Sequence, residues 1–165
     1  MSVDLIMEDA RWKSLNLLQI SNNAFKETLL HLNLRPENFF CCILACSNEK
    51  IKGLNAKFRG KNNSTNVLSF PSTSKICEVT SSPNFETNVD PFELGDIAIA
   101  YEICKQEADF SKIDFEHYVY HLIIHSVLHL LGYDHEEEKN AIKMEKIEVQ
   151  VLAKLGINNP YLHDL

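Results

Sequence analysis

HYVYHLIIHSVLHLLGYDH, residues 117–135, joins an apolar stretch to histidines that recur at every fourth position. Residues four apart lie on the same face of an α-helix, so the pattern predicts a helix over residues 115–131 with a stripe of histidines along it. The stripe consists of His117, His121, His125 and His129. Neighbours in it are separated by a rise of ~6 Å, and zinc needs its nitrogen ligands at about 2.0 to 2.1 Å. Only one adjacent pair can therefore hold the same ion.

A glycine beyond this helix offers a route to a third ligand. Gly132 can adopt the left-handed conformation that ends a helix and turns the chain back, which would return His135 to the helix. The pair nearest this turn is His125 and His129. We therefore predict a site for one divalent ion per chain, zinc, held by His125, His129 and His135 with one position left for water. The two earlier histidines are expected to support the ligands, to pack or to lie at the surface.

The residue after the first ligand bears on the class of enzyme. The spacing HxxxHxxGxxH resembles the zinc-binding helix of metzincin peptidases, which carry a glutamate directly after the first histidine as general base. Ser126 occupies that position here. The usual peptidase mechanism is therefore disfavoured, and a peptidase would need a base from elsewhere in the fold.

Three polar residues near the predicted site each have two interpretations. Asp134 either accepts a hydrogen bond from a ligand histidine or caps the final helix, and the acidic residues 136–138 that follow favour capping. Asn66 and Asp96 lie at predicted strand ends. They either face the same cleft, where they would position water or ribose, or make the local backbone hydrogen bonds that such residues commonly make.

The remainder of the chain contains short apolar strands and amphipathic helices. The predicted strands cover residues 3–7, 39–45, 66–70 and 95–100, and the further helices cover residues 11–32, 49–58, 101–109 and 136–155. The Ser-, Thr- and Pro-rich segment 71–91 is expected to be a long surface loop. Strands and helices do not alternate strictly. We therefore predict an α+β fold with a small mixed four-stranded sheet covered by helices, in a single domain over residues 1–165.

Charge and hydropathy limit the partners. The 165 residues carry a net charge of −7, which is unfavourable for a protein that coats nucleic acid without sequence preference. Residues 50–75 nevertheless contain Lys and Arg but no Asp or Glu, so this region can face an anion. No apolar run approaches the ~20 residues of a membrane span, and the start MSVDLIMEDARWK lacks the features of a secretory signal. We expect a cytoplasmic protein with no membrane or DNA partner.

The five cysteines are an odd number without CxxC pairs, which indicates neither a disulfide framework nor a zinc ribbon. We expect them to be buried thiols. A metal cluster of Cys41, Cys42 and Cys46 is disfavoured because adjacent residues of a strand face opposite sides.

Three blocks of the sequence together resemble one family. LNAKFRGKNNSTNVLSFP (54–71), GDIAI (95–99) and HSVLHLLGYDH (125–135) are similar, in this order, to the YbeY family of bacterial endoribonucleases. The resemblance implies a zincin-like fold and a single-strand-specific, metal-dependent ribonuclease. Such an enzyme acts in 16S rRNA 3′-end maturation and ribosome quality control, with ribosomal RNA and the ribosome or its proteins as partners.

The resemblance also assigns residues. It implies metal ligands at His125, His129 and His135 and a functionally important arginine at Arg59. A guanidinium suits a reaction that places negative charge on phosphate oxygens, and the alternative is that Arg59 pairs with an acid or lies along the surface. Many members have glycine where Ser126 stands. Two further functions stay open, a metallopeptidase and a noncatalytic zinc-containing protein that binds the ribosome through its basic segment.

Overall fold

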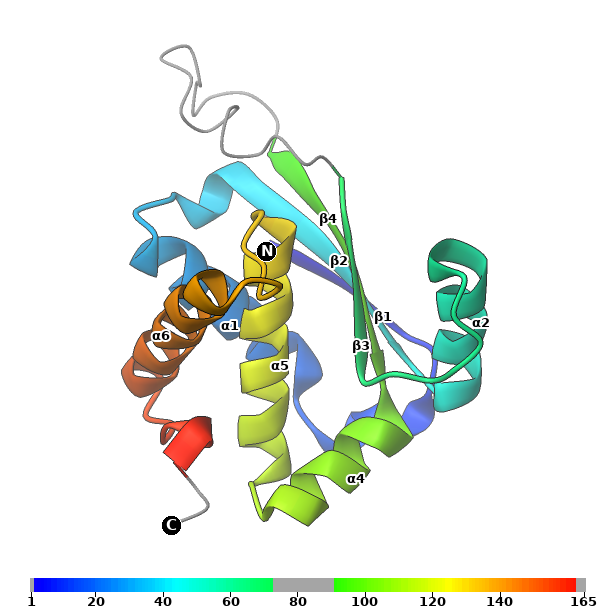
Figure 1. Ribbon diagram of the computed structural model, residues 1–165. Coiled ribbons are helices and arrows are strands. Elements are labelled where there is room, and N and C mark those ends of the chain that lie inside the picture. Colours follow the sequence, from blue (N-terminus) through cyan, green and yellow to red (C-terminus); the bar gives the residue numbers. More distant parts are fainter. Residues whose placement is uncertain (1, 73–90, 163–165) are drawn as a thin grey trace.

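A four-stranded mixed sheet forms the centre of the computed structural model, which describes residues 2–72 and 91–162 (Figure 1). The strands are β1 (Val3–Met7), β2 (Phe39–Cys46), β3 (Val67–Pro71) and β4 (Phe92–Ala100). Their order in the sheet is β1-β2-β4-β3. β1, β2 and β4 are parallel, whereas β3 is antiparallel to β4. β3 therefore lies at an edge of the sheet.

Helices cover both faces of the sheet (Figure 1). One face carries α1 (Leu17–His31), α5 (Phe115–Leu130) and α6 (Glu138–Lys154), and the opposite face carries α2 (Asn48–Arg59). α4 (Tyr101–Ser111) continues directly from β4. Three short 3-10 turns, η1 (Ala10–Ser14), η2 (Pro36–Asn38) and η3 (Pro160–Leu162), complete the described elements. α5 contacts β3, which places the histidine stripe beside the sheet edge.

Side-chain alternation along the strands produces two apolar cores. Ile43 and Ile97 belong to the larger core, together with residues of α1, α5 and α6. Ala98 of β4 and Ile51 of α2 belong to the smaller core on the opposite face. Burial of an aliphatic side chain contributes roughly 1.5 to 3 kcal/mol, so the larger core holds α5 firmly against the sheet.

The first predicted helix is wrong in its extent. Residues 11–32 form the turn η1 followed by α1, which begins only at Leu17. The side chain of Asn16 accepts a hydrogen bond from the amide of Gln19 and so caps α1. Trp12 is fully buried and its indole N–H donates to the carbonyl oxygen of Cys46 at 3.0 Å. This tertiary contact separates η1 from the helix that the apolar spacing suggested.

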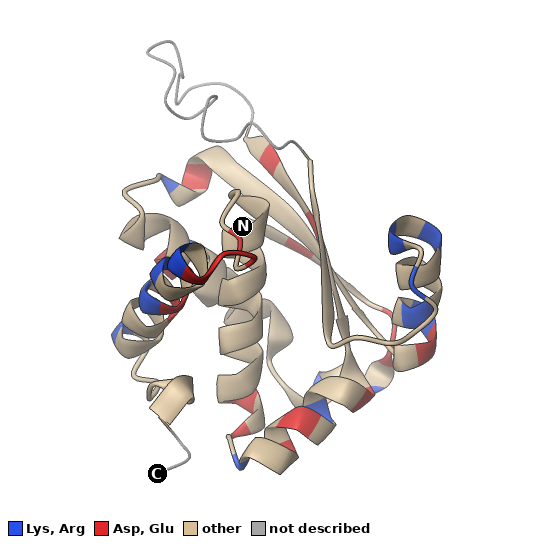
Figure 2. Ribbon diagram, in the orientation of Figure 1, with Lys and Arg blue, Asp and Glu red and all other residues tan. Residues whose placement is uncertain are grey.

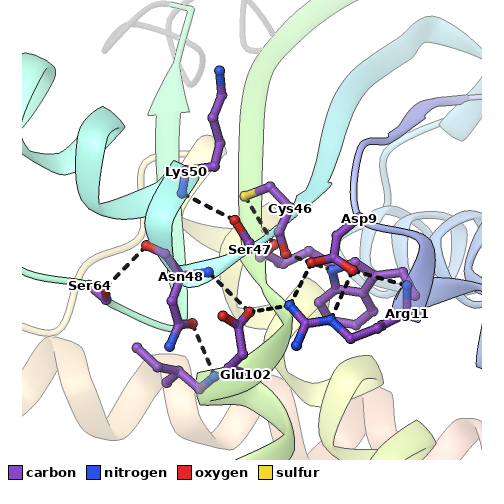
Figure 3. A network of polar contacts seen from close by, with 11 residues as sticks. Asp9, Arg11, Cys46, Ser47, Asn48, Lys50, Ser64 and Glu102 are labelled. Atoms are coloured by element: carbon purple, nitrogen blue, oxygen red, sulfur yellow. Dashed lines mark hydrogen bonds and ion pairs between the residues drawn. The ribbon is translucent and has the colours of Figure 1, made fainter.

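A polar network fastens the beginning of α2 to the beginning of α4 (Figure 3). The backbone amide of Asn48 donates to Glu102 at 3.1 Å, and the Asn48 side chain accepts from the amide of Ile103 at 3.2 Å. Arg11 pairs with the same glutamate at 2.9 Å and with Asp9 at 2.7 Å. These contacts fix the start of α2 relative to β4.

The architecture confirms the predicted α+β fold and its mixed four-stranded sheet. The predicted strands are present, with β4 beginning at Phe92, three residues earlier than expected. The final helix begins at Glu138 rather than at residue 136. Most of the predicted loop 71–91 lies outside the described residues. In the parts of the chain that the structure describes, none of the helices is long and apolar enough to cross a membrane.

Candidate metal centre

The histidine-bearing helix has clear signals at both ends. Asp114 caps α5 by accepting a hydrogen bond from the amide of His117 at 3.3 Å. At the other end Gly132 has a φ of 99°, and the amide of Tyr133 donates to the carbonyl of Leu128 at 3.0 Å. The left-handed residue turns the chain back as predicted, because glycine adopts this conformation without a steric penalty. His135 is thereby returned to the last turns of α5.

The side chains of His125, His129 and His135 converge at this end of the helix. Their ligand nitrogens all lie within 4.8 Å of one another. The Nε2 atoms of His125 and His129 are 3.0 Å apart. A tetrahedral ion with nitrogen ligands at about 2.0 to 2.1 Å would hold them about 3.3 Å apart. The grouping therefore has the dimensions of a metal centre.

The hydrogen bonds of the two helical histidines determine which nitrogen faces the centre. Nδ1 of His129 lies 2.9 Å from the carbonyl oxygen of Tyr133, which can only accept, so this nitrogen carries the proton. Nδ1 of His125 likewise donates to Oε2 of Glu148 at 3.0 Å. With both Nδ1 atoms engaged by acceptors, the Nε2 atoms are the nitrogens that face each other across the centre. A divalent ion such as zinc binds histidine through such nitrogens, so the donor set fits this kind of ion.

Glu148 of α6 is the main site residue that the sequence analysis missed. Its side chain is 1% exposed, and it also accepts hydrogen bonds from His121 at 2.5 Å and from the hydroxyl of Tyr161 at 2.6 Å. The signal was an acidic residue on the apolar face of α6, between Ile147 and Val151, both of which are buried. A buried carboxylate needs hydrogen-bond partners, and here the partners include a predicted ligand.

Burial and hydrogen bonding set the charges of this centre. Burial, together with the smaller effects of the neighbouring His125 and His135, lowers the pKa of His129 to about 4. Burial alone would raise the pKa of Glu148, but hydrogen bonds from His121, His125 and Tyr161 outweigh it and hold this pKa at about 2. At neutral pH the structure therefore combines a neutral His129 with an ionised Glu148.

A hollow of about 240 Å³ opens beside His125, the first of the three proposed ligands. Its lining includes His121 and His125 of α5, Tyr161 of η3, and the side chains of Asn66 and Glu107. His117, by contrast, is exposed and lines a neighbouring hollow of about 200 Å³. His121 thus supports the centre through Glu148, which is one of the roles expected for the earlier histidines.

Arg59 lies at the end of α2, across the sheet from α5 (Figure 1). Its guanidinium donates to the carbonyl oxygen of Ser69 on the edge strand β3 at 2.5 Å and lies 5.6 Å from the ring centre of Phe70. Within residues 2–72 and 91–162 no hydrogen bond or ion pair joins Arg59 to the three histidines. The structure therefore groups the histidines and places the arginine at the sheet edge.

Ser126 and Asp134 each stand next to a proposed ligand in the sequence, and both make hydrogen bonds to nearby backbone groups. The hydroxyl of Ser126 is buried and donates to the carbonyl of Leu122 at 2.8 Å, so it does not replace the glutamate of a peptidase. Asp134 accepts from the amide of Glu136 at 3.4 Å, in the turn before α6. It also accepts from the side-chain amide of Asn140 on α6 at 3.5 Å. The N-cap of α6 is Glu137, so Asp134 does not cap this helix as expected.

Asn66 and Asp96 do not face the same cleft. Asn66 lines the hollow beside His125, at the start of β3. Asp96 pairs across the sheet with Phe70, near the other end of that strand. It lies beside Cys42 on the face of the sheet that carries α2. The antiparallel register of β3 and β4 separates the two residues.

The cysteines largely follow the expectation of buried thiols. Cys41, Cys46 and Cys104 are buried, and Cys42 is half-buried. Cys41 belongs to the larger core and Cys46 to the smaller one, so the two lie on opposite faces of the sheet. Cys77 lies outside the described residues. A cluster of Cys41, Cys42 and Cys46 does not form.

The basic segment of the sequence becomes one surface. Figure 2 shows basic residues along α2 and just beyond it, and acidic residues in the segment that leads into α6. The basic residues are Lys50, Lys52, Lys57, Arg59 and Lys61. This surface lies on the side of the sheet opposite to the histidine centre.

Comparison with known proteins identifies the family of the chain. A family model described as endoribonuclease YbeY matches residues 5–156, a range that contains all three histidines and Arg59. The chain belongs to the YbeY family. A YbeY endoribonuclease of Jannaschia sp. is 38% identical over 161 residues, which cover 98% of this chain and 100% of the relative. That of Ruegeria pomeroyi is 41% identical over 167 residues, covering 98% of each.

A solved structure has a similar fold. A protein of Thermotoga maritima, known from a solution structure, superposes with a TM-score of 0.57 at 21% identity, covering 93% of this chain and 91% of the other. At this identity the likeness concerns the fold alone. Family membership and fold therefore rest on separate observations.

Proposed function

We propose that this protein is a metal-dependent endoribonuclease that cleaves single-stranded RNA. The observation that carries the proposal is the pair of Nε2 atoms of His125 and His129, 3.0 Å apart, with both Nδ1 atoms engaged by acceptors. The imidazole of His135 completes a three-nitrogen set. Three protein ligands with an open position are typical of catalytic zinc, whereas structural zinc sites usually close their shell with four. We propose one Zn²⁺ per chain.

The roles of the protein's own groups follow from their contacts. His125, His129 and His135 would bind the ion, which supplies Lewis-acid chemistry and an acidified water when bound. Glu148 keeps the proton of His125 on Nδ1 and so presents Nε2 to the centre. Tyr133 does the same for His129 through its carbonyl oxygen.

Arg59 is proposed to bind phosphate oxygens of the substrate. Asn66, just before β3, and Ser72, just after it, make backbone hydrogen bonds to β4. Hydrogen-bonded positions alternate along an antiparallel pair, so Ser69 lies at a position whose carbonyl points away from β4. The guanidinium that contacts this carbonyl is therefore at the free edge of the sheet. At this edge we propose that it binds the backbone phosphates of an RNA strand, whose negative charge a guanidinium stabilises.

The proposed biological role is 16S rRNA 3′-end maturation and ribosome quality control in the cytoplasm, with the ribosome or its proteins as partners. Family membership supports this role, and the basic surface of α2 suits an RNA partner. A noncatalytic ribosome-binding protein would use the same surface. The buried hydroxyl of Ser126 makes a peptidase the weaker alternative.

One preparation can test the enzyme against these alternatives. Metal content per chain would be measured for the purified protein and for His125→Ala, His129→Ala and His135→Ala, together with cleavage of a single-stranded RNA and of a casein substrate. We expect close to one ion per chain, and we expect each variant to lose metal and RNA cleavage together. Stoichiometric metal with cleavage of neither substrate would favour the ribosome-binding role, and cleavage of casein without cleavage of RNA would favour the peptidase.

A further inference from the structure

Glu107 of α4 is an acidic side chain in the wall of the hollow that also contains His125. It is exposed, so a nucleic-acid strand that occupies the hollow can contact it. A carboxylate repels a phosphodiester, and the repulsion grows where protein replaces water. Its presence in this wall is favourable only if the ligand also offers a hydrogen-bond donor.

Two neighbours hold Glu107 in place. The hydroxyl of Tyr118 donates to its Oε2 at 2.6 Å, and Nδ2 of Asn66 donates to the same oxygen at 3.3 Å. The amide of Asn66 also donates to the Tyr118 hydroxyl at 3.2 Å. The backbone of Asn66 is fixed because its carbonyl accepts from the amide of Ala100 at 3.0 Å. Three side chains from three segments thus form one rigid polar group.

Tyr118 donates in its neutral form. Burial, and secondarily the hydrogen bond to Glu107, raise its pKa well above the usual value. In the described part of the chain, both hydrogen bonds to Glu107 end on Oε2. Its other oxygen, Oε1, therefore keeps its capacity to accept from a ligand.

RNA offers a suitable donor at every nucleotide. The 2′-hydroxyl can donate to a carboxylate, and it is the group by which a protein distinguishes RNA from DNA at a given position. Amino groups of the bases also donate, but they differ from base to base. A carboxylate that must accept a hydrogen bond from strands of any sequence therefore suits the 2′-hydroxyl of ribose, which every nucleotide of RNA carries.

We propose that Glu107, positioned by Asn66 and Tyr118, accepts a hydrogen bond from the ribose 2′-hydroxyl of a nucleotide beside the cleaved bond and so selects RNA over DNA. This inference rests on the proposed ribonuclease function. It assigns Glu107 to recognition of substrate, since its hydrogen bonds lead to Asn66 and Tyr118 and not to the three histidines.

The test uses the metal-loaded protein and a set of single-stranded RNAs, each with one 2′-deoxy residue at a successive position around the cleavage site. For the unchanged protein, kcat/KM should fall about tenfold to a hundredfold at one position, the loss expected for a hydrogen bond to a charged group. The informative position is one where the deoxy strand is still cut. This condition separates the contact from a 2′-hydroxyl that serves as internal nucleophile.

Glu107→Ala should cut the all-ribose strand about as slowly as the unchanged protein cuts the deoxy strand, and it should show no preference at that position. Glu107→Gln keeps the chain length and an uncharged acceptor, so its preference should be intermediate. Asp109→Ala is the matched control, because Asp109 is an exposed acid on the same helix that pairs with Lys105. It should keep the full preference.

Three results would overturn the inference. The two Glu107 variants could slow the all-ribose and the deoxy strand by the same factor, or they could cut both strands at the rates of the unchanged protein. The preference could also follow removal of a base amino group instead of the 2′-hydroxyl. Failure of the proposed function looks different. In that case the unchanged protein with its metal would cut none of the strands.

Discussion

Oε2 of Glu148 accepts a hydrogen bond from Nδ1 of His125 at 3.0 Å, which links the buried face of α6 to the histidine centre on α5. The contact fixes the tautomer of His125 and the orientation of its ring. Carboxylates in this relation to a ligand histidine raise its basicity and its affinity for metal. The packing of α6 against α5 in the core thus contributes to the metal affinity of the centre.

Glu148→Gln should weaken Zn²⁺ binding about tenfold to a hundredfold, because the neutral amide holds His125 less strongly than a carboxylate. The affinity can be measured by competition with a chromophoric chelator. Glu145→Gln is the control, since Glu145 lies on the same helix and is exposed. Equal affinities for the two variants would contradict the role of Glu148.

Arg59→Ala should keep its metal and lose about 100-fold to 1,000-fold in kcat, the loss expected when a donor to developing negative charge is removed. His129→Ala should lose metal and activity together. Metal analysis and RNA cleavage on the same samples separate the two effects, with Lys26→Ala as a control, since Lys26 is an exposed cation on α1 and lies outside the basic surface of α2. Full turnover by the arginine variant would show that its place at the sheet edge serves another purpose.

The grouping of the three histidines could be predicted because it depends on local structure. Helical periodicity aligns His125 and His129, and the positive φ of Gly132 turns the chain back toward them. Glu148 was not predicted, since its contact depends on how α6 packs against α5. Sequence spacing carries no direct information about such a distance, although an acid among buried apolar residues was a usable signal.

The extent of the first helix shows the same limit. Apolar spacing continued from residue 11 to residue 32, but Trp12 packs against Tyr101 and Phe115 and hydrogen-bonds to the end of β2. These tertiary contacts override the local pattern. The strands were predicted more accurately, because each has an apolar run bounded by turn residues.

Stability without metal should depend on pH through His129. Its pKa is about 4 in the folded protein and near 6.5 when exposed, so between these values the unfolded chain binds the proton more readily. The free energy of unfolding should therefore rise as the pH increases from about 4 to about 6.5. Glu148, with a folded pKa of about 2, adds a similar dependence only at lower pH, below its ordinary value of 4.5.

Urea denaturation of chelator-treated protein at pH 5 and pH 7 would measure this dependence. His129→Gln is the matched variant, because it cannot gain the proton in either state. Its stability should change less between the two pH values than that of the unchanged protein. The same change in both proteins would assign the dependence to other groups.

Gly95 lies where β4 is irregular, at a shift of register opposite Phe40 and Cys41 of β2. Its φ is 139°, and a Cβ atom at this position would lie 2.2 Å from the carbonyl oxygen of Phe70. Gly95→Ala should therefore destabilise the fold by about 1 to 3 kcal/mol, since strain in the backbone and a clash with β3 act together. Thermal or urea denaturation would measure the loss.

Gly53→Ala is the opposite case within the same chain. Gly53 lies inside α2, and a Cβ atom there would meet nothing within 4 Å. Alanine in a helix interior is favoured over glycine by roughly 0.5 to 1 kcal/mol, so this variant should be more stable than the unchanged protein. Opposite signs for the two substitutions are expected because β3 approaches Gly95 closely and α2 leaves Gly53 open. A stabilising Gly95→Ala would mean that β3 does not pair with β4 in this register.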